Sequence, residues 1–401
     1  MRLLFVHQNF PGQFRDLAPG LMAKGHDVRA IAGHQKPLAE GLEVLRYAPE
    51  EPERHGIHAR TTEVDDWIRR GSTVAELAEQ WRQQGWAPDA ILAHPGWGET
   101  LFIQEVYPSS AVILWPELWL RDEHMGVARG QGRVDLNQRC YLRVKNWLVE
   151  GALANCQAAV VPTAYQANCF PAQWQSKLTV LHEGVQDSLL EEPRLQQLCL
   201  PDGQVLGPGV PVITYASRNL EPMRGFDRFL HGLVVLQQRK PEAHVLIAGS
   251  SGSSYSGSPA EGKTWKDVAC EAVEGRLNLE RVHFLGHLSH DNLVRVFRRS
   301  NLHVYLSNSF VLSWSVLEAM ACGAPILAED NAMLRELEGL GGSVGFCRSG
   351  DAQKLGEQMA KQLEHQPASD SAPRQLSPEL RLSHTLTSLE GLIERTVGGR
   401  F

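Results

Sequence analysis

Two arginines stand six positions apart in a loop that follows an apolar run. Arg218 and Arg224 lie in the segment 215–226, and Gly225 follows the second of them. A guanidinium group keeps its charge at any working pH and can clamp phosphate oxygens through two parallel N–H bonds. Gly225 lets a helix start tightly after the loop. Either arginine alone reads most simply as a surface residue, but the pair predicts a diphosphate site.

The start of an expected helix is a second candidate for phosphate binding. Ser313, Trp314 and Ser315 follow the small polar loop 307–312, and Ser313 or Ser315 is the expected N-cap. Free backbone N–H groups and the positive end of the helix dipole favour phosphate at such a start. Glu318 lies about one turn inside, where it can accept hydrogen bonds from ribose hydroxyls. An ordinary capped helix with a solvated Glu318 is the alternative.

A loop of small residues is the third candidate. Residues 250–258 are mostly Ser and Gly, with Tyr255 among them, and they follow the apolar run 244–248. Such a loop can fold over a nucleotide, with Tyr255 as a stacking or hydroxyl contact. A mobile surface loop is the alternative interpretation.

Three residues of the first half also lie just after expected strands. Gly12 permits close approach of a ligand to the backbone, His94 follows the run 90–93, and Glu117 follows the run 111–115. We expect His94 and Glu117 to face the reacting centre. For Glu117 a helix cap or a satisfied core carboxylate is the alternative.

The elements that must position these loops are short apolar runs alternating with helical stretches. This order predicts an α/β fold with two Rossmann-like domains, whose parallel sheets are covered by helices and face a cleft. We expect domains at 1–185 and 211–378, a linker at 186–210, and a C-terminal helix in 379–401 that crosses back to the first domain. The expected strands are 3–6, 28–32, 90–93, 111–115, 158–161 and 178–181, then 212–215, 244–248, 282–285, 303–306 and 325–327.

Composition excludes several classes of protein. The 401 residues are 43% hydrophobic and carry a formal charge of -7 without long charged runs, which disfavours nucleic-acid binding. The seven cysteines form no cluster at metal spacing, so no metal site is expected. No signal peptide or membrane span is evident, and we expect a cytoplasmic protein. The locally basic stretch 139–147 could give peripheral contact with the inner membrane face, although a solvated helix is the simpler interpretation.

The segment 318–325 resembles the end of the signature of the retaining glycosyltransferases of family four, which have the GT-B fold. That signature closes with Glu-Ala-Met-Ala-x-Gly-x-Pro, and this chain matches it. The family usually has another Glu eight positions earlier, where this chain has Phe310. It also has an Arg and, six residues on, a Lys on the donor diphosphate, at the positions of Arg218 and Arg224. The segments 7–14, 92–99 and 181–185 resemble one bacterial subgroup of the family.

The resemblance implies a glycosyltransferase that moves a sugar from a UDP- or GDP-sugar donor to a hydroxyl of a glycan, lipid-linked or small-molecule acceptor. It implies retention of configuration, no metal and no other cofactor. In relatives the backbone near Gly286 holds the nucleobase. Two other functions stay open: a nucleotide-sugar 2-epimerase of the same fold, and a nucleotide-sugar-binding protein without turnover, since Phe310 replaces a donor contact.

Overall fold

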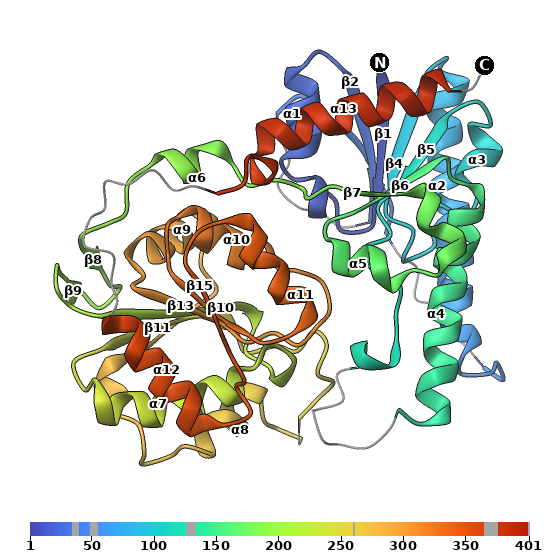
Figure 1. Ribbon diagram of the computed structural model, residues 1–401. Helices are drawn as coiled ribbons and strands as arrows, with labels where there is room; N and C mark the ends of the chain where they lie inside the picture. The colour runs from blue at the N-terminus through green and yellow to red at the C-terminus, as the bar shows by residue number, and fades with distance from the viewer. Residues whose placement is uncertain (34–39, 49–54, 126–133, 260, 365–375, 400–401) are drawn as a thin grey trace. The chain divides into compact units, whose positions relative to one another are not determined.

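The computed structural model describes residues 1–33, 40–48, 55–125, 134–259, 261–364 and 376–399. The chain forms two compact units. The first contains Met1–Met125, Arg133–Gly184 and Glu379–Phe401, and the second contains Val185–Pro378. Figure 1 gives the labels of their helices and strands.

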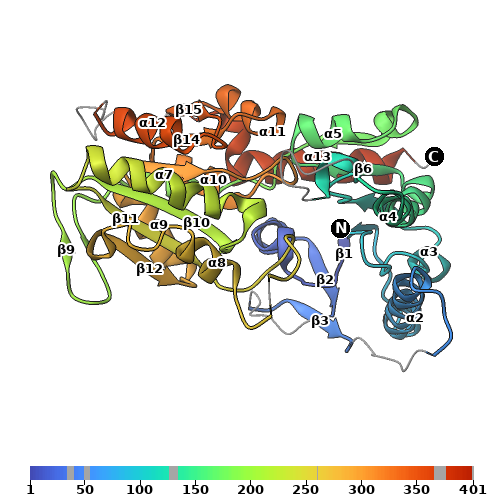
Figure 2. The same ribbon diagram turned by 90° about the horizontal axis from the view of Figure 1, so that it is seen from below.

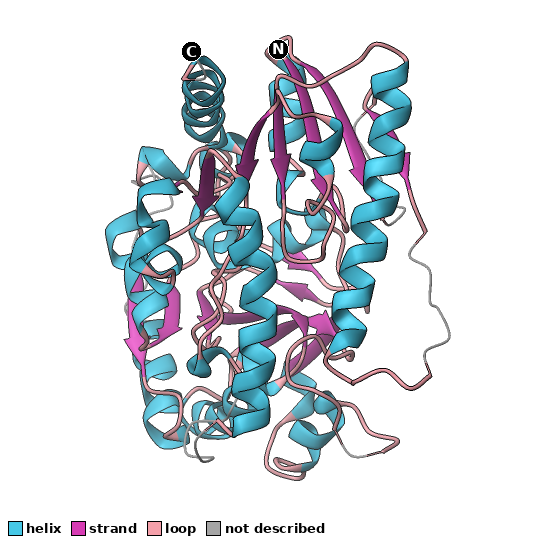
Figure 3. Cartoon of the chain, turned by 90° about the vertical axis from the view of Figure 1, so that its right-hand side faces the viewer, coloured by secondary structure: helices cyan, strands magenta, loops and turns pink. Residues whose placement is uncertain are grey.

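The first unit is built on a parallel sheet whose central strands are buried on both faces. Its strand order is β3-β2-β1-β4-β5-β6-β7, and its strands are drawn as neighbouring arrows in Figure 3. All four residues of β4, β5 and β6 are buried, as expected for parallel strands between two helical layers. The strands are β1 Arg2–His7, β2 Asp27–Ala32, β3 Glu43–Arg46, β4 Ala90–Ala93, β5 Ala111–Leu114, β6 Ala158–Val161 and β7 Leu178–Val180.

Helices cover both faces of the first sheet. Leu3 and Phe5 of β1 pack with α1 (Leu17–Ala23) and α13 (Leu382–Gly398). Leu4 and Val6 point to the other face, because side chains alternate along a strand, and they pack with α2 (Thr61–Gln83) and α4 (Leu136–Asn155). The short helices of this unit are α3 Ile103–Val106 and α5 Ala164–Cys169.

The C-terminal helix therefore belongs to the first unit. Leu389, Leu392 and Ile393 of α13 lie in the same buried cluster as Leu3 and Phe5, and α13 runs beside α1 in Figure 1. The prediction that this helix crosses back to the first domain is confirmed.

The second unit repeats the same plan. Its parallel sheet has the order β12-β11-β10-β13-β14-β15. Helices α7 (Phe226–Arg239), α8 (Trp265–Glu271) and α12 (Ala352–Glu364) pack on one face, and α9 (His290–Arg299) packs on the other, which can be followed in Figure 2. The remaining elements are β10 Val212–Asn219, β11 His244–Ser250, β12 Val282–Gly286, β13 Leu302–Tyr305, β14 Ile326–Glu329, β15 Val344–Cys347, α10 Trp314–Ala321 and α11 Ala332–Arg335.

The segment 186–210 differs from the linker that its Pro, Gly and polar residues suggest. It contains α6 (Asp187–Glu191) and a small antiparallel pair, β8 (Leu198–Cys199) and β9 (Val205–Leu206). Leu198, Leu200 and Leu206 are buried in one cluster with Val212 of β10. Because isolated leucines in a polar stretch give no periodic pattern, the sequence did not reveal this packing.

Two edge strands, β3 and β15, were not expected from the sequence. Most of their residues are only partly buried, so they lack the continuous apolar run that marks a central parallel strand. The predicted central strands are all present.

Both sheets reverse their strand order at one place. In the first, β2 and β4 lie on opposite sides of β1. In the second, β11 and β13 lie on opposite sides of β10. In open parallel sheets the loops that follow the strands diverge at such a crossover and leave room for a ligand. The carboxyl ends of β1, β4, β10 and β13 are therefore where candidate sites are sought.

In the described part of the chain, no helix is both long enough and apolar enough to span a bilayer.

The docking of α13 can be tested by a pair of neighbouring substitutions. Ile393 is fully buried in the core of the first unit and Glu394 beside it is exposed. We expect Ile393→Ala to lower the free energy of unfolding of the first unit by about 2–5 kcal/mol. Glu394→Ala should change it by less than about 0.5 kcal/mol. Urea unfolding of the full chain followed by tryptophan fluorescence measures both, and equal effects of the two variants would show that α13 is not docked as described.

Candidate functional site

Arg218 and Arg224 lie at the carboxyl end of β10, at the crossover of the second sheet. The register of β10 against β11 shifts between Ala216 and Asn219, so the strand is irregular where Arg218 stands. Arg218 is exposed. Arg224 ends the short turn Pro222–Arg224, and Gly225 follows it with φ 76°. A Cβ atom on Gly225 would lie 2.5 Å from Cβ of Leu306, so only glycine fits this close approach.

The guanidinium group of Arg224 points toward the neighbouring strand β13. Its Nη1 donates to Oγ of Ser307 at 3.3 Å, and Ser307 follows β13 directly after Leu306. Among the described residues neither Arg218 nor Arg224 forms an ion pair with a carboxylate. The positive charge of Arg224 is thus available to an anion at the place where the strand order reverses.

Arg228, one turn further along α7, has the opposite role. Its guanidinium lies 3.2 Å from Oε2 of the fully buried Glu329 and also donates to Oγ of Ser349 at 2.8 Å. It donates in addition to the carbonyl of Leu306 at 2.8 Å and to Oδ1 of Asn308 at 3.1 Å. Arg228 therefore ties the ends of β13, β14 and β15 together. This role of Arg228 was not predicted from the sequence, because residue order alone does not show which arginine forms an ion pair with a carboxylate.

The loop after β11 is held by one buried carboxylate. Oε2 of Glu221, a residue only 1% exposed, accepts backbone N–H bonds from Ser254, Tyr255 and Ser256 at 3.1, 3.0 and 2.9 Å. Oγ of Ser256 in turn accepts from the backbone N–H of Met223 at 2.9 Å. These bonds attach residues 254–256 to the turn that carries Arg224, while residues 253–255 stay exposed at the surface.

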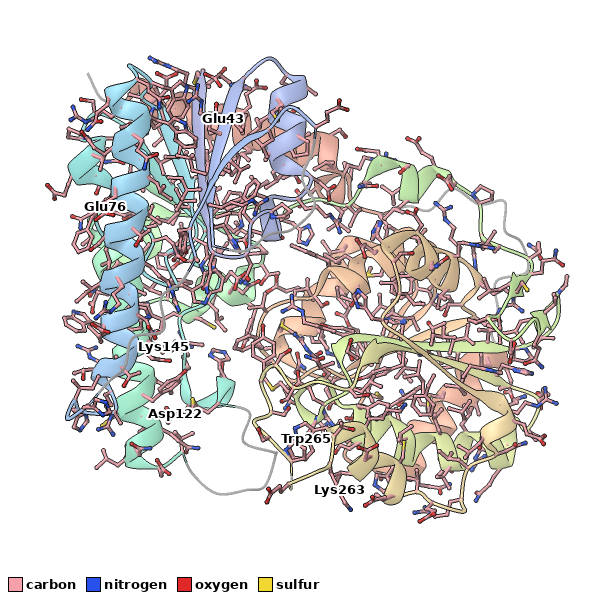
Figure 4. The ribbon with its side chains drawn as sticks, turned by 180° about the vertical axis from the view of Figure 1, so that it is seen from behind. Glu43, Glu76, Asp122, Lys145, Lys263 and Trp265 are labelled. Carbon is pink, nitrogen blue, oxygen red and sulfur yellow. The ribbon has the colours of Figure 1, made fainter. Side chains whose placement is uncertain are left out.

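The far end of the same loop is held by a tryptophan at the start of α8. Nε1 of Trp265 donates to the carbonyl of Gly257 at 3.0 Å. Figure 4 labels Trp265 and its neighbour Lys263 where the chain leaves the loop. The loop is thus attached at both ends, and its central residue Tyr255 has a defined place.

Tyr255 lies between a cation and an aromatic ring. The guanidinium carbon of Arg224 is 5.3 Å from the centre of the Tyr255 ring, and the ring of Phe310 is 4.9 Å away, centre to centre. Tyr255 is 44% exposed. The backbone N–H of Phe310 donates to the sulfur of Met333 at 3.4 Å. Phe310, the residue that departs from the glycosyltransferase signature, therefore packs on Tyr255, which the sequence predicts to contact the nucleotide.

The start of α10 is capped as expected. Ser313 is the N-cap, and its Oγ accepts from the backbone N–H of Ser315 at 3.4 Å and lies 2.9 Å from Oγ of Ser315. Trp314 and Ser315 are partly buried. Glu318 is 5% exposed, and its Oε1 lies 2.9 Å from Nε2 of His290. Glu318 is therefore not the solvated residue of the alternative interpretation, and it holds the first residue of α9.

Gly286 ends β12 with φ 66° and is exposed. No described atom lies within 4 Å of the position that a Cβ atom would take there. The residue therefore leaves its backbone open at the carboxyl edge of the second sheet, three strands along from β13.

The first unit gathers histidines and a tryptophan at its own crossover. His7 ends β1 and His94 follows β4, and their ring centres are 5.4 Å apart. The indole of Trp97 stacks on His94 at 4.0 Å and meets His7 edge-on at 5.1 Å. Gly12 lies against the same group, because a Cβ atom there would be 2.5 Å from Cε1 of His7. Gly12 and His94, predicted separately, thus belong to one cluster, to which His7 and Trp97 also contribute.

His94 is oriented so that one ring nitrogen faces Glu117. Its Nδ1 accepts the backbone N–H of Gly96 at 3.0 Å, so Nε2 carries the proton in the neutral ring. Nε2 has no hydrogen-bond partner in the described structure, although it lies 3.5 Å from Oε2 of Glu117. Glu117 has φ 54°, a backbone conformation that costs a non-glycine residue about 1–3 kcal/mol and is concentrated at functional sites.

A buried carboxyl lies behind this cluster. Glu99 is fully buried, and its Oε1 accepts the hydroxyl of Tyr47 at 2.6 Å. Burial raises the pKa of the Glu99 carboxyl, and burial together with the neighbouring Glu99 raises the pKa of Tyr47. Glu99 lies in the segment 92–99, but its burial was not predicted, since burial cannot be read from a single acidic residue in a sequence.

Glu123, His124 and Cys169 offer potential metal-binding atoms within 4.8 Å of one another. Nδ1 of His124 accepts the backbone N–H of Arg121 at 2.8 Å, so Nε2 holds the proton in the neutral ring and has no lone pair for a metal. Burial lowers the pKa of His124 to about 4 and raises the pKa of the Cys169 thiol. The group is better described as a hydrogen-bonded cluster with Tyr165, whose hydroxyl lies 3.0 Å from Nε2 of His124.

Comparison with known proteins defines the class to which this fold and these sites belong. Residues 24–189 match the profile of the Glycosyl transferase family 4 group, and residues 205–377 match that of Glycosyl transferases group 1. The chain belongs to this family of glycosyltransferases, which have the GT-B fold.

Solved structures agree over the full length. The Anabaena protein HepE, solved in complex with UDP and glucose, has a TM-score of 0.68 and 15% sequence identity over 98% of this chain and 99% of its own. Sucrose-phosphate synthase from Thermosynechococcus elongatus has a TM-score of 0.64 and 14% identity, covering 100% of both chains. At these identities the likeness shows the fold alone, two Rossmann-like parallel sheets, as predicted from the sequence.

Curated relatives match over shorter segments. The D-inositol 3-phosphate glycosyltransferase of Mycolicibacterium gilvum is 30% identical over 31% of this chain and 25% of its own length. The mannosylfructose-phosphate synthase of Agrobacterium fabrum is 24% identical over 47% of this chain and 40% of its own length. The chain thus spans well under two thirds of the length of these relatives.

The loop anchor formed by Glu221 can be tested by hydrogen exchange. In Glu221→Ala the amide hydrogens of Ser254, Tyr255 and Ser256 should exchange about tenfold faster or more, because hydrogen bonds to a buried charged acceptor are lost. Glu221→Gln keeps an oxygen acceptor and should give an intermediate effect. Glu280→Ala, at an exposed position of the same unit, is the control. Unchanged protection of these amides in Glu221→Ala would contradict the described bonding.

Proposed function

We propose that this protein transfers a sugar from a nucleoside-diphosphate sugar to a hydroxyl of a glycan, lipid-linked or small-molecule acceptor, with retention of configuration and without a metal ion. The observation that carries the proposal is the position of Arg224. Its guanidinium reaches Ser307 at the crossover of the second sheet and has no carboxylate partner in the described structure. A preorganised positive charge at that place suits a diphosphate.

The donor is assigned to the second unit. Arg218 and Arg224 bind the diphosphate, and the N-terminus of α10 at Ser313, Trp314 and Ser315 adds oriented N–H groups. The charge that grows on the leaving diphosphate as the glycosidic bond breaks is stabilised by these groups, which is the role that a metal ion has in other transferases.

The nucleoside is assigned to the residues around the diphosphate site. Gly286 offers its exposed backbone to the base, Tyr255 offers a partly exposed ring, and Glu318 accepts ribose hydroxyls through the carboxylate that also holds His290. The donor is proposed as a UDP- or GDP-sugar, because contacts made through the backbone leave no base-specific signature in the residue types.

Phe310 gives the donor site an apolar contact where relatives carry a carboxylate. Its ring packs on Tyr255, so the pair presents aromatic surface beside Arg224. We propose that a C–H face of the transferred sugar packs on this surface, as sugars pack on aromatic rings. The interpretation of a binding protein without turnover does not follow from Phe310 alone, since the arginines and the start of α10 are intact.

The acceptor hydroxyl is assigned to the first unit, at His94 and Glu117. The 3.5 Å between Nε2 of His94 and Oε2 of Glu117 is spanned by no hydrogen bond. A hydroxyl can accept from the N–H and donate to the carboxylate at the same time, which would orient its oxygen for attack. In the proposed step this oxygen bonds to the anomeric carbon on the face that the diphosphate leaves. The bond between that carbon and the diphosphate oxygen breaks, and the hydroxyl proton shifts from its hydrogen bond with Glu117 to the leaving oxygen.

The names of the curated relatives describe small-molecule chemistry, a D-inositol 3-phosphate glycosyltransferase and a mannosylfructose-phosphate synthase. They support a small hydroxylated acceptor here, beside the glycan or lipid-linked acceptors of polysaccharide biosynthesis. We place the reaction in the cytoplasm, where nucleotide sugars are made, with at most peripheral contact with the inner face of the membrane.

The proposal is tested by incubating the full chain with UDP-, GDP- and ADP-sugars. Thermal stabilisation selects the donor, and NMR then follows its conversion with and without a panel of sugar and polyol acceptors. Retention predicts that the new glycosidic bond has the anomeric configuration of the donor. Conversion of UDP-N-acetylglucosamine alone into its 2-epimer would instead identify an epimerase, and binding without any conversion would identify a protein without turnover.

Removal of either arginine should weaken diphosphate binding. We expect Arg224→Ala and Arg218→Ala each to lower the affinity for UDP about tenfold or more, because charge-assisted bonds to phosphate are lost. Calorimetry with UDP measures the effect. Arg276→Ala, at an exposed position that precedes β12 rather than following a strand, is the control and should bind UDP normally. Normal UDP binding by Arg224→Ala would refute the donor assignment.

Replacement of Glu117 should affect transfer rather than donor binding. Glu117→Gln removes the charged acceptor for the attacking hydroxyl, and the resulting misorientation should lower the rate of transfer about 100-fold. The affinity for UDP should stay unchanged, since Glu117 belongs to the first unit. Steady-state transfer rates and UDP calorimetry on the same variant separate the two effects. A normal transfer rate in Glu117→Gln would contradict the assignment of Glu117 to the acceptor site.

A further inference from the structure

We propose that His182 and Glu183 form a second hydroxyl-binding position in the first unit, and that its ligand is a polyol or sugar moiety of the acceptor. The inference rests on the proposed transferase function and deepens it, because it assigns the chemical class of the acceptor. The juxtaposition that carries it is a buried imidazole with one unpartnered N–H beside a carboxylate.

The imidazole of His182 is fixed in one orientation. Its Nδ1 accepts the backbone N–H of Gly184 at 2.9 Å, so Nε2 carries the proton in the neutral ring. His182 is 8% exposed, and its Nε2 has no hydrogen-bond partner in the described structure. Burial also lowers the pKa of His182 to about 4, which keeps the ring neutral at pH 7. A buried N–H donor without a partner has lost its bonds to water and gained none in the protein, so such a group needs an explanation.

The surrounding backbone is held rigidly, so the open N–H is not the result of a loose loop. Oγ1 of Thr385, a fully buried residue of α13, donates to the carbonyl of His182 at 2.9 Å. Gly184 has φ 81°, and a Cβ atom there would lie 2.7 Å from Cα of Leu382. The helix that completes the first unit thus fixes the segment 182–184 in place.

The carboxylate beside His182 decides which ligand fits. Oε2 of Glu183 lies 3.6 Å from Nε2 of His182, and its Oε1 accepts Nε1 of Trp115 at 3.3 Å. A phosphate or carboxylate ligand would be repelled by Glu183. A hydroxyl can accept from the imidazole and donate to the carboxylate, so the pair is suited to an alcohol rather than to an anion.

The same arrangement occurs at His94. There Nδ1 also accepts the N–H of the glycine two residues on, and Nε2 is also unpartnered and faces a glutamate, at 3.5 Å instead of 3.6 Å. Two such pairs in one unit, each after a strand of the same parallel sheet, match a ligand that carries several hydroxyls.

A line of ring contacts joins the two pairs. Trp115, which bonds to Glu183, lies 5.5 Å from Phe14. Phe14 lies 5.8 Å from His7, and His7 lies 5.4 Å from His94, all measured between ring centres. The two hydroxyl-binding pairs therefore flank one aromatic group at the carboxyl edge of the first sheet. The rings of Phe14 and Trp115 are fully buried, so they hold the two polar pairs in fixed positions, and the pairs themselves supply the contacts to the hydroxyls of a sugar or polyol.

The test compares two substitutions of His182 that separate its two nitrogens. Asn places its side-chain oxygen near the position of Nδ1, so His182→Asn keeps the bond to Gly184 and removes the Nε2 donor. Gln places its amide nitrogen near the position of Nε2, so His182→Gln restores that donor. The probes are D-glucose and myo-inositol, titrated into the full chain by ligand-observed NMR. His384→Asn, at an exposed position of α13, is the control.

We expect at least one of the two probes to bind the wild-type protein and to shift the ¹⁵N resonances of His182. His182→Asn should weaken that binding about tenfold, while His182→Gln and His384→Asn should stay within about threefold of wild type. Binding of neither probe, equal binding by His182→Asn, or a His182 ring protonated on Nδ1 would overturn the proposal. A failure of the transferase assignment is distinguishable, because it appears as wild-type protein that neither binds UDP nor transfers sugar, whatever the polyol titration gives.

Discussion

The burial of parallel strands on both faces is the constraint on which both candidate sites depend. A parallel strand cannot return by a tight turn, so its connection crosses a face of the sheet, usually as a helix, and every strand delivers its following loop to the same edge. Where the order of strands reverses, two such loops separate. In this chain those places hold Arg224 with Ser307 in the second unit and His7 with His94 in the first. The polar residues are brought together by topology, although they are far apart in the sequence.

Much of this arrangement could be predicted from the sequence, because the central strands are continuous apolar runs and the loops between them carry unusual residues. The loop of Arg218 and Arg224, the cap at Ser313 and the presence of a terminal helix follow from local patterns, whereas the return of that helix to the first unit is implied by the resemblance to the GT-B family. What could not be predicted is the pairing of charges. Arg228 and Arg224 are four residues apart in the sequence, yet only Arg228 meets a buried carboxylate. Likewise Glu221 looks like an ordinary loop residue until four consecutive residues are seen to donate to it.

The departure at Phe310 acquires a physical meaning from its neighbours. Exchange of a carboxylate for a phenyl ring would leave an unsupported apolar residue if nothing packed on it. Here Tyr255 does so, and Tyr255 is itself placed by Glu221 and lies over Arg224. The residue at position 310 thus departs from the glycosyltransferase signature, and the loop that faces it supplies a ring that packs on it. In the proposed donor site this is a change of contact rather than a loss of the site.

The position of α13 has a consequence for how the chain acquires its structure during synthesis. The face of the first sheet that holds Leu3 and Phe5 is completed by residues near the C-terminal end of the chain, Leu389, Leu392 and Ile393. A ribosome makes the first unit's strands early, but the last layer of their core emerges only after the whole second unit has been translated. The second unit can therefore fold first, while the part of this apolar face that α1 does not cover stays open to a chaperone.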